Sequence, residues 1–206
     1  MKYLDLVNKY PIMSLQINRA SLSLVLRELE TVLEQGIAGD IAEFGCYSGT
    51  TSLFIRRVLD ARQEIGRTFY AYDSFAGLPE KTSADSSTLG TQFKAGELAV
   101  SKKEFLRNFQ KAGLRPPITH KAWFSDLQSG QLPATLAYAF LDSDFYQSIL
   151  DSLELVWPRL SRGGVITIDD YQRLELPGVT QAVTEFCRGK AVKLHFEYHT
   201  GIMRKL

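Results

Sequence analysis

The sequence predicts a single α/β domain with a mostly parallel β-sheet, helices on both faces and one antiparallel strand at the C-terminal end. Short apolar runs that suit buried parallel strands alternate with amphipathic helical patterns along most of the chain. The last two β-like runs are joined too closely for a crossover helix, so they must be antiparallel neighbours. A chain of 206 residues, of which 45% are hydrophobic, can bury one full core.

The charge distribution and the apolar runs exclude several classes of protein. The 24 basic and 23 acidic residues are interspersed, so the sequence predicts no binding to nucleic acid or to an anionic membrane. No apolar run approaches the roughly 18 residues of a membrane span, and the N-terminus lacks the layout of a signal peptide. The two cysteines, Cys46 and Cys187, are far apart, which predicts reduced thiols in a cytoplasmic protein.

The first part of the chain predicts one amphipathic helix. Apolar residues recur at helical spacing from about Ser14 to Gln35, and two glycines then end the pattern. The tail before this helix could cover the mouth of an active site or pack on a partner subunit of a homo-oligomer. We therefore expect a helical segment, residues 1–38, packed on a main domain, residues 39–206.

A strand followed by a glycine turn and a helix comes next. The apolar run that ends at Phe44 leads into Gly45 and Gly49, and glycines at such a turn let the backbone approach a ligand closely. The spacing is not G-x-G-x-x-G, which weakens a dinucleotide interpretation. Glu43 lies just before the turn, and an acid there suits a ligand with an ammonium group or hydroxyls.

The second predicted strand ends at Asp73. An acid at this position can accept hydrogen bonds from a ribose diol. The alternative is that Asp73 only caps the turn that follows it. Residues 79–100 then show little periodicity, and a loop of this length predicts either a lid or a disordered segment.

A capped helix and a third strand follow the loop. Ser101 is placed as the helix N-cap, Glu104 stands at the capping-box position, and Gly113 marks the end. The strand after it ends near Trp123 and Phe124. This aromatic pair could flank an adenine ring or could pack in the core.

Acidic residues follow the last two parallel strands. Asp142 and Asp144 come directly after one buried strand, and Asp169 and Asp170 come after the next. Because the carboxyl ends of parallel strands meet at one edge, these acids should lie close together and repel each other. We therefore predict a bound divalent metal, although Asp144 could instead cap the helix that begins at Phe145.

The remaining elements complete the pattern. The segment S-R-G-G, residues 161–164, is interpreted as the turn before the fifth strand. Pro177 stands near the first turn of the last helix, where proline is favoured. The closing pair of strands is expected to turn at Thr200 and Gly201.

With these elements in this order, the chain resembles the class I S-adenosylmethionine-dependent methyltransferases, which have a Rossmann-like sheet of this kind. More closely, it resembles the macrocin O-methyltransferase (TylF-like) family. The matching stretches run in family order from Gly39 to Val183, about seven tenths of the chain. They are GDIAEFGCYSG, YDSFAGLPE, FKAGELAVS, WFSDL, FLDSDFYQSILDSLE, RLSRGGVITIDDY and PGVTQAV.

The resemblance implies a cofactor site and a metal site. Asp73 would hold the ribose hydroxyls of S-adenosylmethionine. A Mg²⁺ ion would be bound by Asp142, Asp169 and Asp170, of which Asp142 and Asp170 would serve in catalysis, and oxygen-only ligands suit such a hard cation. The residues implied to bind the cofactor are Glu43, Gly45, Tyr47, Ser48, Gly49, Thr50, Asp73, Ser74, Phe75, Asp126 and Asp142.

The implied activity is metal-dependent transfer of a methyl group to a hydroxyl of a sugar or glycosylated small molecule. The general base is not assigned, because Lys81 and Asp85 of the long loop are candidates without support and His199 is better explained as a turn residue. Two alternatives stay open. One is a nicotinamide-dependent oxidoreductase on a related fold, and the other is a catalytically silent binding protein.

Overall fold

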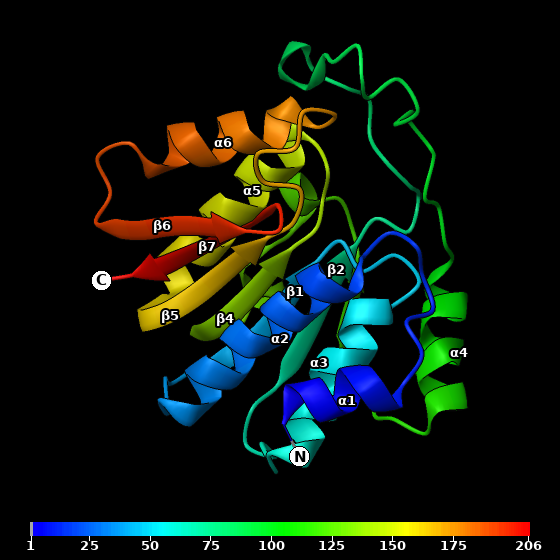
Figure 1. Ribbon diagram of the computed structural model, residues 1–206, viewed down its shortest axis with the longest axis vertical. Coiled ribbons are helices and arrows are strands. Elements are labelled where there is room, and N and C mark those ends of the chain that lie inside the picture. The colour runs from blue at the N-terminus through cyan, green and yellow to red at the C-terminus, as the bar shows by residue number, and fades with distance from the viewer. Residues whose placement is uncertain (1) are drawn as a thin grey trace.

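The computed structural model describes residues 2–206, and these form one seven-stranded sheet with the strand order β3-β2-β1-β4-β5-β7-β6 (Figure 1). Only β7 runs against the others, since β5 and β6 both pair with it in antiparallel fashion. The predicted fold class is therefore confirmed. The strands are β1 (Asp40–Phe44), β2 (Phe69–Asp73), β3 (Ile118–Lys121), β4 (Leu136–Leu141), β5 (Leu160–Ile168), β6 (Val192–Glu197) and β7 (Thr200–Lys205).

Helices cover both faces of this sheet. One buried cluster joins α1, α2 and α3 to β4 and β5, and a second joins α5 and α6 to the opposite side of the same strands. In Figure 1, α2 crosses the near face. None of the helices in residues 2–206 is long and apolar enough to cross a membrane. The helices are α1 (Tyr3–Lys9), α2 (Arg19–Glu34), α3 (Thr50–Ala61), α4 (Lys102–Ala112), α5 (Tyr146–Val156) and α6 (Pro177–Cys187), with one-turn helices η1 (Ser83–Asp85), η2 (Phe124–Asp126), η3 (Ser129–Gln131) and η4 (Trp157–Arg159).

The order of the strands determines where a ligand can enter. From β1 the chain moves outward through β2 to β3, and it then returns to place β4 on the other side of β1. The connections that leave β1 and β4 therefore diverge at their carboxyl ends. An open α/β sheet forms its ligand crevice at this kind of switch point.

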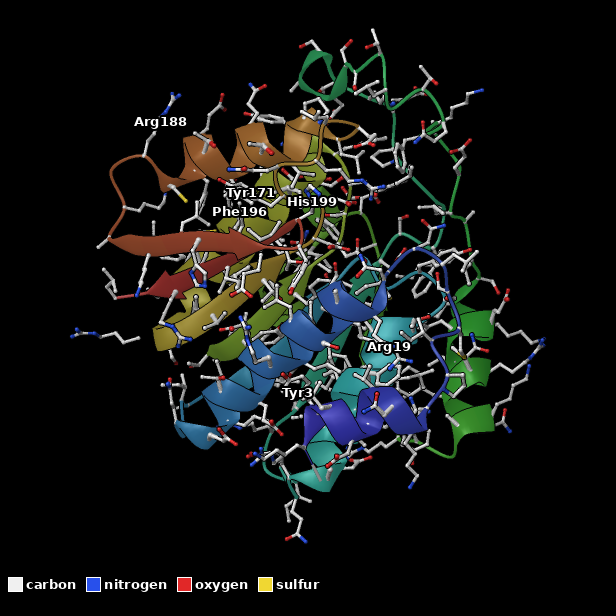
Figure 2. All side chains as sticks on the ribbon, in the orientation of Figure 1. Tyr3, Arg19, Tyr171, Arg188, Phe196 and His199 are labelled. Atoms are coloured by element: carbon white, nitrogen blue, oxygen red, sulfur yellow. The ribbon has the colours of Figure 1, made fainter. Side chains whose placement is uncertain are left out.

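The N-terminal segment contains a helix that the sequence pattern did not reveal. Leu6 and Val7 of α1 are buried against the cluster that includes α2, and Arg19, labelled in Figure 2, donates to the carbonyl of Val7 at 2.9 Å. The predicted helix begins at Arg19 and not near Ser14, because the side chain of Asn18 caps it by accepting from the amide of Ser21.

The C-terminal half departs from the predictions at two turns. Residues 161–164 were predicted as a turn but belong to β5, where the pairing register with β4 shifts between Leu136 and Tyr138. The last two strands turn at Tyr198 and His199, which adopt left-handed backbone angles, and not at Thr200 and Gly201.

Other local predictions are confirmed. Ser101 caps α4 by accepting from the amide of Glu104 at 3.1 Å, and Gly113 ends the helix in the left-handed conformation. A contact that was not predicted is the edge-on packing of Tyr171 against Phe196 of β6, both labelled in Figure 2. Cys46 and Cys187 are free thiols.

Candidate active site

A cavity of about 470 Å³ opens at the carboxyl ends of the central strands. It collects residues from the first glycine turn, the end of β2, the 79–100 loop, and the loops that follow β3, β4 and β5. The residues of the predicted sites that line it are Gly45, Tyr47, Asp73, Ser74, Asp142, Asp144 and Asp170, together with Trp123 and Phe124.

The three predicted metal ligands lie together, and two of them, Asp142 and Asp170, line this cavity, whereas Asp169 is buried behind them. Asp142, Asp169 and Asp170 each place a carboxylate oxygen within 4.8 Å of the other two. The backbone explains their closeness. The amide of Asp142 donates to Phe44 at 2.8 Å and the amide of Asp169 donates to Leu141 at 2.9 Å, so the ladder continues past the strand ends.

The charge of this cluster is poorly compensated. Burial, followed by the nearby charge of Asp170, raises the pKa of Asp169 to about 8, and burial with repulsion from Asp169 raises the pKa of Asp142 well above its usual value. Within residues 2–206, the cluster has one salt bridge to a basic side chain, from Arg173 to Asp170 at 2.7 Å. A close group of oxygen donors that repel each other when ionised fits a hard divalent cation, whose charge would stabilise the ionised form.

Asp144 was predicted either as a fourth metal ligand or as the N-cap of the next helix. The prediction that it is the N-cap is wrong. Asp144 adopts a left-handed backbone angle, and Phe145 occupies the N-cap position without a side-chain cap. The first amide of α5, that of Tyr146, donates instead to Asp85 of the long loop at 2.6 Å. Asp144 lines the cavity, and burial together with Asp170 raises its pKa to about 7.

The glycine turn after β1 allows two close approaches. A Cβ atom at Gly45, which has a left-handed backbone angle, would overlap the carbonyl oxygen of Asp142. Only glycine therefore lets the end of β1 meet the loop that carries the acids. Gly49 is the N-cap of α3, and a Cβ there would lie 3.0 Å from the ring of Phe105.

Asp73 both shapes its turn and faces the cavity. Its carboxylate accepts hydrogen bonds from the amides of Cys46 at 2.8 Å, Tyr47 at 3.0 Å and Phe75 at 2.7 Å. The sequence left open whether Asp73 binds a ribose or only caps its turn, and the structure is compatible with both roles. The three amide dipoles hold the carboxylate in place, and its position in the lining leaves it available to a ligand.

Glu43 lies beneath the cavity and not in its lining. The side chain is 1% exposed and accepts a hydrogen bond from the hydroxyl of Ser52 on α3. Burial raises the pKa of Glu43 to about 8. Glu43 is therefore mostly protonated at neutral pH in the absence of ligands.

The other predicted cofactor residues differ in their access to the cavity. Phe75 is buried against the ring of Phe105, and Thr50 is buried with a hydroxyl that lacks a hydrogen-bond partner in residues 2–206. The backbone carbonyl of Ser48 accepts from Asn108 of α4. Asp126 is exposed and does not line the cavity, although its neighbour Ser125 does.

Several lining residues were not predicted from the sequence. Gln147, Ser148 and Asp151 form a polar stripe on α5 that continues from Asp144 at helical spacing, and this pattern was available in the sequence. Arg173 follows the second acidic pair. Leu15 and Gln16 also line the cavity; they precede α2 but fall within the helix predicted from about Ser14, so no sequence pattern indicated them.

Comparison with known proteins agrees with this architecture. Residues 10–198 match the profile of the family described as macrocin-O-methyltransferase (TylF). The chain belongs to this family. The match favours the methyltransferase hypothesis over the nicotinamide-dependent oxidoreductase, and the antiparallel β7 does the same.

Two relatives that are named as O-methyltransferases are similar over most of this chain. The 8-demethyl-8-(2,3-dimethoxy-alpha-L-rhamnosyl)-tetracenomycin-C 4'-O-methyltransferase of Streptomyces olivaceus is 39% identical over 149 residues, 69% of this chain and 57% of the relative. The mycinamicin III 3''-O-methyltransferase of Micromonospora griseorubida is 33% identical over 165 residues, 77% of this chain and 64% of the relative. The chain thus spans about three fifths of the length of these relatives.

Solved structures of methyltransferases share the fold. The O-methyltransferase NovP superposes with a TM-score of 0.80 at 28% identity, over 92% of this chain and 80% of NovP. The calicheamicin methyltransferase CalS11 superposes with a TM-score of 0.75 at 18% identity, over 98% of this chain and 89% of CalS11. The seven-stranded mixed sheet with its C-terminal antiparallel hairpin is the class I methyltransferase architecture.

Proposed function

We propose that this protein transfers a methyl group from S-adenosylmethionine to a hydroxyl of a sugar on a glycosylated small molecule, with a divalent metal held by Asp142, Asp169 and Asp170. One observation carries the proposal. A single cavity is lined by Asp73 near its glycine turn and by Asp142 and Asp170, which form one carboxylate cluster with the buried Asp169 at the ends of β4 and β5. Such a cavity can hold a cationic nucleoside and a metal-bound acceptor side by side.

The cofactor half of the proposal rests on the ends of β1 and β2. Asp73 is held in place by three amides, two on Oδ2 and one on Oδ1, so Oδ1 keeps a lone pair that can accept from a ribose hydroxyl without a change of conformation. Trp123 is 40% exposed and lines the cavity, where its ring can stack on a base. The acidic lining also favours a ligand that carries a sulfonium charge.

The acceptor half rests on the acid cluster. A sugar hydroxyl is a poor nucleophile at neutral pH, and Mg²⁺ held by the three aspartates would supply Lewis-acid stabilisation of the alkoxide. The chain itself holds these carboxylates at one edge of the sheet and presents the polar stripe of α5 beside them. An acceptor oriented there gains the advantage of proximity to the methyl group.

The class of acceptor is inferred from relatives of known activity. The names of the relatives from Streptomyces olivaceus and Micromonospora griseorubida place the transferred methyl group on primed positions of glycosylated natural products. We therefore propose a sugar hydroxyl of such a glycoside as the acceptor of this protein.

The experiment measures cofactor binding, metal dependence and turnover separately. Calorimetry with S-adenosylhomocysteine should show binding, and NAD should not bind; the reverse result would refute the assignment. Transfer of labelled methyl groups to a panel of rhamnosides should stop in EDTA and return with Mg²⁺. Asp142→Asn and Asp169→Asn should lose turnover by about two orders of magnitude or more, whereas Asp60→Asn on the outer surface of α3 should not.

A silent binding protein would give a different pattern. It would bind S-adenosylhomocysteine without transferring a methyl group to any member of the panel. Its biological effect would be the same in the parent protein and in Asp142→Asn. If methyl transfer continues at full rate in EDTA, the methyltransferase assignment stands and the proposed role of the metal is refuted.

A further inference from the structure

The loop of residues 79–100 is closed at its base by backbone hydrogen bonds. The amide of Leu78 donates to the carbonyl of Glu97 at 2.8 Å, and the amide of Gly96 donates back to Leu78 at 2.9 Å. A loop whose ends meet in this way is a compact surface element. Figure 1 shows it in green, reaching past the first turn of α6.

The buried residue at the centre of this loop is Asp85, which is 2% exposed. Its carboxylate accepts from the amide of Thr82 at 2.9 Å, from the hydroxyl of Thr82 at 2.7 Å and from the amide of Tyr146 at 2.6 Å. Tyr146 is the first residue of α5, so Asp85 caps a helix that belongs to another part of the chain. A carboxylate occupied in this way is not placed to act as a general base.

The start of α6 also meets Asp85. Gly178 lies in the first turn of α6, and a Cβ atom there would overlap Oδ1 of Asp85 and lie 2.9 Å from the amide nitrogen of Tyr146. The carboxylate therefore lies where two helices begin, and the partial positive charge of a helix N-terminus favours an acid there. Helices α5 and α6 are the ones that follow the two acid-bearing loops.

The same part of the loop contacts the segment after β5. The hydroxyl of Ser87 donates to the carbonyl of Leu174 at 2.9 Å, and a Cβ atom at Gly90 would overlap the carbonyl oxygen of Glu175. Lys81 closes this part of the loop by donating to the carbonyl of Gly90 at 2.6 Å. Residues 81–90 thus contact the segments that follow both β4 and β5.

We infer that Asp85 is a positioning residue that holds the loop carrying Asp142 at a set distance from the loop carrying Asp169 and Asp170. The reason is geometric. The carboxylate of Asp85 accepts from the first amide of α5 and meets the first turn of α6, and these two helices follow the two acid-bearing loops. Asp142 precedes Tyr146 by one short turn, so the bond from Tyr146 to Asp85 restrains the loop of Asp142. The restraint also opposes the repulsion that arises when the three acids ionise to bind a cation.

This inference rests on the proposed function for what the cluster binds, but the restraint itself concerns the metal-free chain. Asp85→Ala removes the acceptor for the amide of Tyr146. Gly178→Ala changes no polar group and instead pushes a methyl group against Asp85. Gly66→Ala is the matched control, because a Cβ atom at Gly66 meets open space.

Two readouts test the inference. In metal-free protein, hydrogen exchange at residues 142–146 should become faster in Asp85→Ala and in Gly178→Ala but not in Gly66→Ala. In calorimetry, both variants should bind Mg²⁺ about tenfold to a hundredfold more weakly, with the affinity for S-adenosylhomocysteine changed by less than about threefold, which is under 1 kcal/mol. A general loss of structure would weaken both ligands, so the split between them is the specific signature.

The outcomes separate this inference from the proposed function. Unchanged exchange and unchanged Mg²⁺ affinity in both variants would overturn the positioning role. If the parent protein binds no Mg²⁺ but both variants still exchange faster at residues 142–146, the restraint holds and the metal proposal fails. If Asp85→Ala does not fold, Gly178→Ala and Asp85→Asn test the positioning role instead. Asp85→Asn keeps an oxygen for the amide of Tyr146, so it should keep most of the parent's protection against hydrogen exchange at residues 142–146.

Discussion

Substitution of Glu43 by glutamine should change how the stability of the ligand-free protein depends on pH. Glu43 is 1% exposed, and burial raises its pKa from 4.5 to about 8. Below pH 4.5 the carboxyl group is protonated in both the folded and the unfolded chain. Between pH 4.5 and 8 the unfolded chain loses this proton while the folded chain keeps it, so the free energy of unfolding falls as the pH rises.

The size of the effect follows from the same pKa. At about 1.4 kcal/mol per pKa unit, a rise from 4.5 to about 8 corresponds to a loss of about 5 kcal/mol above pH 8. Since a buried site can relax and admit water when it ionises, about 5 kcal/mol is the upper end of the expected loss. Glu43→Gln keeps the shape of the side chain and an oxygen for Ser52 but cannot ionise, so it should not show this loss.

Urea unfolding at pH 5, 7 and 9 in EDTA measures the effect. The difference in free energy of unfolding between Glu43→Gln and the parent should increase from pH 5 to pH 9, because the titration of groups distant from Glu43 cancels in the difference. Glu104→Gln removes an exposed carboxylate from α4 and should give a difference that stays level. If the difference in free energy of unfolding between Glu43→Gln and the parent also does not change with pH, the inference that this carboxyl is buried in its protonated form is refuted.

Three further predictions follow from the site and the core. Asp169→Asn should abolish the rise in melting temperature that Mg²⁺ gives the parent protein, as measured by thermal unfolding with and without the metal. Gly45→Ala should push the turn away from Asp142 and weaken S-adenosylhomocysteine binding by about tenfold or more in calorimetry, since overpacking costs about 1–3 kcal/mol. Tyr138→Phe, which removes a buried hydroxyl 2.5 Å from that of Thr167, should lower the free energy of unfolding by about 1–3 kcal/mol in urea.

The sequence predicted the sheet and the acid cluster because both depend on local patterns and one rule of topology. Each apolar run is long enough for a single strand, and each ends at the residue where its acids begin. Since neighbouring parallel strands present their carboxyl ends at one edge, Asp142 and Asp169 could be placed together without a structure. The same reasoning placed Asp73 at the end of the second strand, where an acid can accept hydrogen bonds from a ribose diol.

What the sequence did not predict depends on partners that are distant in the chain. Asp85 caps α5 from a segment 61 residues earlier, so the nearer acid, Asp144, was the better candidate by sequence alone. Residues 161–164 have the composition of a turn, but pairing with β4 keeps them in β5. In both cases a tertiary contact outweighs the local preference.

The acids of the cavity fall into two groups, and the difference between them indicates what each can bind. Asp73 accepts from three backbone amides, which supply most of the stabilisation that its charge needs. The side chains of Asp142, Asp169 and Asp170 have little such support beyond Arg173, so their ionised forms need a cation to balance their charge. An acid of the first kind suits neutral hydroxyl groups, whereas a cluster of the second kind suits a cation. A single cavity can therefore hold a nucleoside at one end and a metal-bound sugar at the other without competition between the two sites.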